Sequence, residues 1–299
     1  MKPKPWTILV TGATTGVGLA LARRLIKKSQ HRLVLTARAS SLPRFEEEGI
    51  QESDRIRLRA LDVTNTEERQ AVVEATMAEW GVIDVLVNNA GLAVRAVVEH
   101  MASKELAAQM DVNLIGPISL ARHVLPAQRA QGFGRILNVS SVGGMMAMPT
   151  MGAYSASKWA LEGASESLWY EVRPWGVSVS LIEPGFIRSD GFEHVRYTAQ
   201  SSESNDHIDD AYHNHYEYMS GFIGRVMRRS PATPESVASC IYRTLHRRRP
   251  PLRVLATPDA FAFNLMRRML PRRPYHWVLH RSLPGIRHWG PNAEARKRD

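Results

Sequence analysis

The amino-acid sequence predicts an α/β protein with a single doubly wound parallel sheet of about seven strands and helices on both faces. Its short apolar runs are continuous and do not alternate with polar residues, which is typical of strands buried on both faces. These runs alternate with amphipathic segments through short connections, as in repeated strand–helix units with right-handed crossovers. The 299 residues are enough for one large α/β domain of this kind.

The regular part of the chain begins near the N-terminus. Residues 6–10 form an apolar run that ends at Thr11-Gly12, which indicates a strand entering a turn. Residues 18–28 carry apolar side chains on one side and charges elsewhere, which predicts a helix. By the same criteria we expect further strands over 32–36, 56–61, 82–87, 135–139 and 177–182, and helices over 67–80, 103–131 (with Ser103 as N-cap) and 154–172.

The pattern becomes irregular after Pro184-Gly185. We expect the segment from about 186 to 230, which is rich in Ser, Asp, His and Tyr, to form a lid. The run Thr233-Pro234-Glu235 is a strong helix start, for a helix that continues to about Leu245. Residues 252–256 are expected to add the seventh strand.

These elements place one domain over residues 1–257, followed by a C-terminal extension over residues 258–299. The composition, 44% hydrophobic and 23% charged, excludes wholesale disorder. The single cysteine, Cys240, excludes a disulfide framework and a multi-cysteine metal site. The first apolar run is too short for a signal peptide, and no run of about 18 apolar residues is present. We therefore expect a cytoplasmic protein.

The net charge of +10 is concentrated at the C-terminal end of the chain. Residues 225–299 hold 17 Lys and Arg against 4 Asp and Glu, whereas residues 1–224 hold 22 against 25. The body of the protein is thus slightly acidic. No recognised nucleic-acid motif accompanies the basic segment, so we expect no specific nucleic-acid binding.

A glycine-rich turn between the first strand and the first helix is the first candidate site. Residues 11–18, Thr-Gly-Ala-Thr-Thr-Gly-Val-Gly, have the spacing G-x-x-x-G-x-G, which lets the backbone approach a pyrophosphate at a helix N-terminus. A tight glycine turn is the alternative for the loop taken alone. The second strand leads into Ala37-Arg38, where an NAD site usually has an acidic residue, and an arginine can pair with a 2′-phosphate. This favours NADP, and a plain surface arginine is the alternative.

The decisive pattern is Tyr154-Ser155-Ala156-Ser157-Lys158. Residues four apart lie on one face of a helix, so Tyr154 and Lys158 point the same way. A nearby ammonium lowers the pKa of a phenol and makes it useful as an acid or base. Ser141 follows the fifth strand, where a loop can bring its hydroxyl beside the start of the helix to hold a substrate oxygen. A surface tyrosine with a solvated lysine is the alternative for the pair taken alone.

In this order, the motifs resemble those of the short-chain dehydrogenase/reductase family, over residues 5–190 and more loosely over 230–257. The residues that carry the resemblance are the glycine loop at 11–18, Asp62-Val63, Asn88-Asn89-Ala90-Gly91, Asn113, Ser141, Tyr154 with Lys158, and Pro184-Gly185. The resemblance implies a Rossmann-type sheet that binds a dinucleotide.

The resemblance also assigns roles to individual residues. Residues 14–17 would wrap the pyrophosphate, 62–63 would flank the adenine, 89–91 would line the ribose side and 184–189 would contact the nicotinamide. The implied cofactor-binding residues are Gly12, Thr14, Thr15, Gly16, Val17, Gly18, Arg38, Asp62, Val63, Asn89, Ala90, Gly91, Tyr154, Lys158, Pro184, Gly185, Ile187 and Ser189. The implied catalytic residues are Asn113, Ser141, Tyr154 and Lys158.

Three of these assignments need comment. Ser141 is preferred over the adjacent Ser140 because the following Val-Gly-Gly matches the family register. Asn113 would hold a water that links Lys158 to solvent, and a polar residue on a packed helix is the alternative. Ser189 stands where the family often has Thr.

The implied reaction is an NADP(H)-dependent interconversion of a carbonyl and an alcohol, with hydride transfer and with Tyr154 as acid or base. Three methionines at 145–148 and the aromatic residues of the lid favour an apolar substrate, and ordinary core packing of the lid is the alternative. Residues 161–163 add a similarity to 17β-hydroxysteroid and retinol dehydrogenases, which suggests a steroid, retinoid or long-chain substrate. The alternative function is a non-catalytic, dinucleotide-binding regulatory or scaffold protein, which need not keep the proton relay.

The remaining expectations concern partners. Phe261, Leu265 and Met269 are spaced at i, i+4 and i+8, and with Trp277 and many arginines they suit peripheral attachment to an anionic membrane. Packing of the extension on its own domain or on a partner subunit is the alternative. We also expect a homo-oligomer. No metal is expected, and His213 and His215 are interpreted as unliganded.

Overall fold

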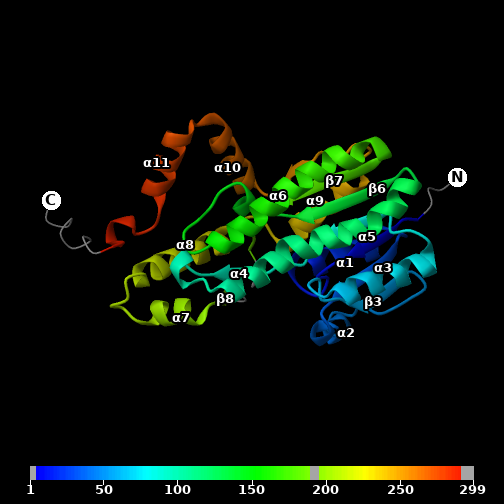
Figure 1. The fold of residues 1–299 in the computed structure, drawn as a ribbon, viewed down its shortest axis with the longest axis horizontal. Coiled ribbons are helices and arrows are strands. Elements are labelled where there is room, and N and C mark those ends of the chain that lie inside the picture. Colours follow the sequence, from blue (N-terminus) through cyan, green and yellow to red (C-terminus); the bar gives the residue numbers. More distant parts are fainter. Residues whose placement is uncertain (1–4, 189–194, 291–299) are drawn as a thin grey trace.

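A computed structural model describes residues 5–188 and 195–290 and contains one main sheet of seven parallel strands (Figure 1). The strand order is β3-β2-β1-β4-β6-β7-β9, and every neighbouring pair is parallel. The predicted fold class is therefore confirmed. The strands are β1 (Thr7–Val10), β2 (Arg32–Ala37), β3 (Ile56–Ala60), β4 (Val85–Asn88), β6 (Gly134–Val139), β7 (Val177–Glu183) and β9 (Arg253–Leu255).

Helices cover both faces of this sheet because successive strand residues point to opposite sides. On β1, Ile8 and Val10 belong to one apolar core and Leu9 belongs to the other. The first core is closed by α1 (Gly16–Lys28) and α9 (Pro234–His246). The second core is closed by α3 (Thr66–Trp80), α5 (Gly116–Ala130) and the end of α6 (Gly152–Val172).

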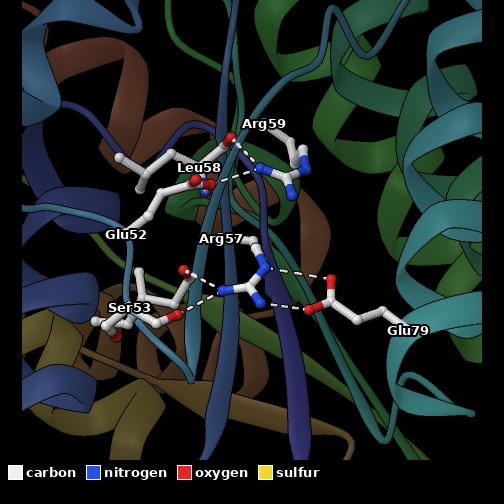
Figure 2. Close-up of polar contacts among 7 residues, drawn as sticks. Glu52, Ser53, Arg57, Leu58, Arg59 and Glu79 are labelled. Atoms are coloured by element: carbon white, nitrogen blue, oxygen red, sulfur yellow. Dashed lines mark hydrogen bonds and ion pairs between the residues drawn. The ribbon is translucent and has the colours of Figure 1, made fainter.

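The outer edge of the sheet is protected by charge. Figure 2 shows that Arg57 on β3 makes a two-point contact with Glu79 of α3. Glu52 accepts a hydrogen bond from Leu58 N at 2.9 Å and one from Arg59 at 2.6 Å (Figure 2). Charged side chains on an edge strand discourage pairing with another chain, so the sheet ends at β3. A short helix, α2 (Pro43–Glu47), which the sequence pattern does not predict, precedes this strand.

The predicted helix over 103–131 is interrupted and begins differently. It divides into α4 (Ser103–Met110), a π-helical turn (Asp111–Ile115) and α5. Ser103 is wrong as the N-cap. The backbone of Ala102 is extended and its carbonyl already accepts a hydrogen bond from Leu106 N, so Ala102 is the cap and Ser103 is the first helical residue.

The segment expected to be a lid contains more structure than its sequence indicates. Its two-residue strand β8 (Arg196–Tyr197) pairs with β5 (Val94–Arg95) of the body, and α7 (Ala199–Asp206) follows. Neither strand is long enough to show a period of two, and α7, which Thr198 caps, has only polar residues after Ala199. The lid ends in a helix, α8 (His213–Arg229), on which Tyr218 and Phe222 stand at the four-residue spacing of one helix face.

The extension forms two helices, α10 (Pro258–Met269) and α11 (Arg272–Ser282), followed by a 3₁₀ turn (Ile286–His288). In Figure 1 they stand apart from the sheet, on the same side of the molecule as α7 and α8. Thr257 caps α10 by accepting a hydrogen bond from Ala260 N. The boundary at residue 257 between domain and extension stays a prediction.

Candidate active site

The candidate site lies at the carboxyl ends of β1, β4, β6 and β7. The chain leaves β1 toward β2 on one side of the sheet, while β4 lies on the other side, so the strand order reverses between β1 and β4. Ligands of doubly wound sheets bind at this switch point. The glycine loop follows β1 and residues 89–91 follow β4, so the fold brings these two predicted segments together.

The glycine loop has the form of an anion cradle. Gly12 (φ +64°) and Gly16 (φ +52°) both have left-handed backbones that favour glycine. Helix α1 has no side-chain cap at Thr15 and no acidic residue in its first turn. Its first N–H groups and the positive end of its dipole therefore suit a pyrophosphate, and the loop fits the dinucleotide that the sequence implies.

Thr11 and Asn89 hold this loop against β4. The Thr11 hydroxyl accepts hydrogen bonds from the backbone N–H groups of Asn89 and Ala90, both at 3.0 Å. The Asn89 amide donates to the Thr11 and Gly12 carbonyls at 3.0 and 2.9 Å. The side chain of Asn89 thus shapes the loop. The role of Thr11, which sequence reasoning missed, follows from its place as the first residue of the glycine motif.

Arg38 and Asp62 lie near each other at the expected adenine end. Arg38 is exposed just after β2. Burial would raise the pKa of the Asp62 carboxyl, but hydrogen bonds from Thr64 and the charges of Arg38 and Arg69 lower it below its ordinary value. Asp62 accepts from Thr64 N at 2.9 Å and is therefore held as a carboxylate beside the guanidinium of Arg38. Val63 follows it in the same buried layer as α5.

Tyr154, Lys158 and Ser141 come together at the start of α6, as their spacing predicts. Lys158 Nζ lies 5.9 Å from the Tyr154 ring centroid and donates to the Val139 carbonyl at 2.9 Å. Burial raises the pKa of the Tyr154 phenol above its ordinary value, although a hydrogen bond with Ser141 lowers it. The net shift is opposite to the lowering expected from the Lys158 ammonium, because the loss of hydration outweighs it. Burial lowers the pKa of Lys158 to about 8, against the opposing charge of Glu162.

The adjacent hydroxyls of Ser140 and Ser141 point to different partners. Ser141 interacts with Tyr154 and accepts a hydrogen bond from Gly143 N at 3.0 Å. Ser140 donates to Glu162 Oε1 at 2.6 Å. A Cβ at Gly143 would lie 2.9 Å from the Tyr154 ring, so glycine is needed for the loop to reach the phenol. This geometry supports the preference for Ser141.

Asn113 is fully buried in the π-helical turn. Its amide oxygen accepts from Leu92 N at 2.8 Å, and its amide nitrogen donates to the Leu92 carbonyl and to Ser157 Oγ at 2.8 and 2.9 Å. The side chain therefore ties the loop after β4 to α6. That Asn113 also holds a water beside Lys158 stays a prediction.

The turn after β7 is held by the start of α10 and by the residue that caps it. Gly185 N donates to Thr257 Oγ1 at 2.8 Å, and Phe186 N donates to Asp259 Oδ2 at 2.7 Å. On the other side, the Pro184 carbonyl accepts from Val142 N at 2.8 Å. The turn implied to contact the nicotinamide is thus fixed between the Ser141 loop and α10. Thr257 and Asp259 were not predicted. Ile187 packs against the core, and Ser189 lies outside the described residues.

Two buried carboxyl groups, Glu162 and Glu183, share an arginine with the more exposed Glu166. Arg253 of β9 contacts Glu162 and pairs with Glu183 at 2.8 Å and with Glu166 at 3.0 Å. Burial and the neighbouring Glu162 raise the pKa of Glu183 to about 7 despite the charge of Arg253. This cluster connects the end of the sheet to the α6 face that carries Lys158.

Metal ligands and membrane-spanning helices were both searched for among the described residues. Within residues 5–188 and 195–290, no group of three or more His, Cys, Asp or Glu is placed to hold a metal ion. His213 approaches Glu217 at 3.8 Å, and His215 packs on Trp289 with ring centroids 4.3 Å apart. No helix among these residues is long and apolar enough to cross a membrane.

Comparison with known proteins decides the family. A model of the short chain dehydrogenase family matches residues 6–200. This chain belongs to the short-chain dehydrogenase/reductase family. The chain is 32% identical to the 3-ketodihydrosphingosine reductase of Bacteroides thetaiotaomicron over 255 residues, which cover 85% of this chain and 89% of that protein. It is 34% identical to human 17-beta-hydroxysteroid dehydrogenase type 1 over 266 residues, covering 84% of this chain and 77% of that protein.

Solved structures agree with this assignment. A short-chain dehydrogenase/reductase from Burkholderia phymatum in complex with NAD has a TM-score of 0.72 and 25% identity, covering 90% of this chain and 94% of that one. A metagenomic short-chain oxidoreductase in complex with NADP has a TM-score of 0.64 and 28% identity, covering 84% and 96%. The short-chain dehydrogenase described here is thus an NAD(P)-dependent oxidoreductase of the EC 1.1.1 type.

Proposed function

We propose that this enzyme interconverts a ketone or aldehyde and the corresponding alcohol on an apolar substrate, with NADP(H) preferred over NAD(H). The observation that carries the proposal is that Tyr154, Lys158 and Ser141 meet, while Met148, in the loop between Ser141 and Tyr154, packs against an apolar cluster of the lid. The bound dinucleotide supplies the hydride for reduction or accepts it in oxidation.

Tyr154 is the acid or base of this mechanism. Because burial raises the pKa of the phenol, Tyr154 holds its proton at neutral pH and is ready to donate it to a carbonyl oxygen. The Ser141 hydroxyl, which contacts the phenol, is placed to hold the same oxygen as negative charge develops on it. In the oxidative direction the same groups act in reverse, with Tyr154 as the base.

Lys158 stabilises the phenolate that remains after proton donation. Its ammonium is buried near the Tyr154 ring and fixed by the Val139 carbonyl, so its charge is little screened by water. Asn113 supports this arrangement by joining Leu92 to Ser157, one residue before Lys158. A protein that only binds a dinucleotide does not need the proton-transfer residues Asn113, Ser141, Tyr154 and Lys158. Their presence argues against the non-catalytic scaffold alternative.

The preference for NADP rests on Arg38. Its exposed guanidinium lies at the end of β2, close enough to Asp62 to lower the pKa of that carboxyl. The 2′-phosphate of NADP(H) would form a charge-assisted hydrogen bond with this guanidinium. The 2′-hydroxyl of NAD(H) carries no charge and would bind it more weakly.

The substrate class rests on the side chains around the lid. Phe186 after β7 and Met219 and Ile223 of α8 form a buried cluster, with Met148 of the catalytic loop and Phe222 packed against it. The rings of Phe186 and Phe222 meet edge to face, with centroids 6.5 Å apart. Such a surface suits a long-chain, steroid or retinoid carbonyl, in keeping with the names of the two relatives.

The partner proposal includes a homo-oligomer. Leu106 in the middle of α4 and Ile115 at the end of the π-helical turn are 40% and 47% exposed, which supports a contact with a second copy. Sedimentation velocity of the full chain tests this: an oligomer is expected, and a monomer at all concentrations contradicts it.

The experiment for the proposed function follows NADPH oxidation with four carbonyl substrates: a long-chain 3-ketone, a 17-ketosteroid, retinal and a small ketone. We expect at least one apolar substrate to exceed the small ketone in kcat/KM by about 100-fold, because burying several methylene groups contributes about 0.8 kcal/mol each. Equal values for all four would contradict the substrate class, and no turnover with any carbonyl would contradict the enzymatic function. Repeating the best reaction with NADH tests the cofactor preference.

A further inference from the structure

The C-terminal extension has an inner face that is anchored to the lid. Phe263, Leu283 and Trp289 pack against the apolar cluster of α8. The amide of Asn214 donates to the His288 carbonyl at 2.9 Å, and Tyr218 stacks on His288 with centroids 5.5 Å apart. The Phe263 contact fixes which side of α10 faces outward, and on α11 the buried residue Tyr275 marks the inner side.

The outer face carries an apolar stripe. Phe261, Leu265 and Met269 on α10 are 59%, 48% and 73% exposed, and Trp277 and Val278 on α11 are also exposed. These five residues are more than a third of the thirteen large exposed hydrophobic side chains among the described residues, although the described extension, 258–290, is a small part of the chain. An exposed apolar stripe of this kind marks an interaction surface.

The same two helices are strongly basic. Residues 258–290 contain six arginines and one acidic residue, Asp259, which is turned inward to Phe186 N. All six arginines are exposed. One of them, Arg267, contacts the Met145 carbonyl and stacks on Trp159 at 4.5 Å, so it belongs to the contact with the body. The other five are Arg268, Arg272, Arg273, Arg281 and Arg287.

We propose that the outer face of α10 and α11 docks on an anionic membrane surface. The apolar stripe requires an apolar phase, which the interfacial region of a bilayer provides and a nucleic-acid backbone does not. The surrounding arginines require negative charge, which anionic headgroups provide. A second copy of this chain fits the surface poorly, because an isologous contact would place one arginine-rich patch against another.

Docking in this way brings the membrane next to the lid. The extension that carries the stripe also packs on α8 and holds the turn at Gly185 and Phe186. The proposal does not depend on the substrate class, because it rests on the stripe and the arginines alone.

The test is co-sedimentation of the full chain with vesicles of phosphatidylcholine alone or with about one-third phosphatidylglycerol. We expect binding to the anionic vesicles only, and weaker binding at high salt. The double variant Leu265→Ser/Met269→Ser should reduce the partition constant by on the order of tenfold or more. Arg272→Gln/Arg273→Gln should reduce it by on the order of twentyfold.

Two matched variants serve as controls. Arg248→Gln/Arg249→Gln removes the same charge from two exposed arginines in the loop before β9, and Ile208→Ser removes an exposed apolar side chain outside the extension. Both should bind anionic vesicles as the natural chain does, and unchanged melting temperatures should show that all four variants are folded. Equal binding to both kinds of vesicle, or equal losses in the control variants, would overturn the proposal. So would a dimer in sedimentation velocity that Leu265→Ser/Met269→Ser abolishes while anionic vesicles are not bound.

Discussion

The carboxyl edge of the sheet and the lid with its extension are built in different ways. At the sheet edge, side chains bind main-chain groups of the neighbouring loop or strand, as Asn89 does with Thr11 and Gly12 and as Lys158 does with Val139. In the lid, side chains bind elements about a hundred residues away. The Tyr216 hydroxyl accepts a hydrogen bond from Val97 N and contacts His100 Nδ1, both at 3.0 Å.

Arg95 makes the largest number of these long-range contacts with the lid and its neighbours among the residues discussed. It is completely buried and donates to Thr150, Tyr197 and Ser220, which come from three separate segments. The first region therefore owes its geometry to the regular register of parallel strands. The second owes its geometry to packing that is particular to this chain. We infer that the chemistry resides in the first region and the choice of substrate in the second.

A large difference in activity is expected between variants of the two neighbouring serines of the first region. Ser141→Ala should lower kcat by about 100-fold to 1000-fold, the usual loss for one donor to a developing oxyanion. Ser140→Ala should lower it by less than about tenfold, because the Ser140 hydroxyl is bound to Glu162. Steady-state NADPH oxidation measures both. Similar losses in the two variants would remove the distinction between the hydroxyls.

The next effect concerns the cofactor. Arg38→Ala should raise the Kd for NADPH by about tenfold to 100-fold, since a charge-assisted hydrogen bond to phosphate is lost. The Kd for NADH should change little. Arg44→Ala, which removes another exposed arginine from α2, is the control. Calorimetric titration measures both Kd values. An equal loss of affinity for NADPH and NADH would show that Arg38 does not bind the 2′-phosphate.

A third prediction tests whether the two regions are connected. Asp259→Ala leaves the Phe186 N–H without its acceptor, so the free energy of unfolding should fall by about 1–3 kcal/mol. Asp259→Asn keeps an acceptor oxygen and should restore most of this loss. Urea denaturation of both variants provides the measurement. If the alanine variant is as stable as the natural chain, the extension does not hold the turn after β7.

The smallest effect is a shift in pH dependence. Lys158, with a pKa near 8, carries its charge below that pH and loses it above, so reduction should decline as pH rises through about 8. The negative charge of Glu162 raises the pKa of Lys158. Glu162→Gln should therefore move the alkaline limb of kcat/KM to lower pH. Glu166→Gln, one turn farther along α6 and also paired with Arg253, should leave the limb in place. Identical limbs would contradict the role of Glu162.

The sequence predicts much of the fold because continuous apolar runs and amphipathic helices are local signals. All seven strands of the main sheet and the long helices α1, α3, α5, α6 and α9 lie where such signals occur, with ends shifted by a few residues. The elements that were missed lack these signals. The strands β5 and β8 have two residues each, α2 has five, and α7 has only polar residues after Ala199.

The site shows the same division. Tyr154 and Lys158 can be placed together from helical spacing alone. The contacts of Thr257 and Asp259 with the turn after β7 span 72 and 73 residues. The cluster of Glu162, Glu183 and Arg253 depends on the parallel register of Leu181 with Arg253, which no motif in the chain indicates. Contacts of this kind follow only from the assembled fold.

The central claim is that Tyr154 exchanges the proton in this reaction. It is tested most directly by Tyr154→Phe, which removes one hydroxyl, beside Tyr170→Phe, which removes an exposed hydroxyl from the same helix. We predict that Tyr154→Phe lowers single-turnover NADPH oxidation by about 1000-fold while the Kd for NADPH stays within about twofold, and that Tyr170→Phe changes neither. A Tyr154→Phe enzyme that retains most of its turnover would contradict the account.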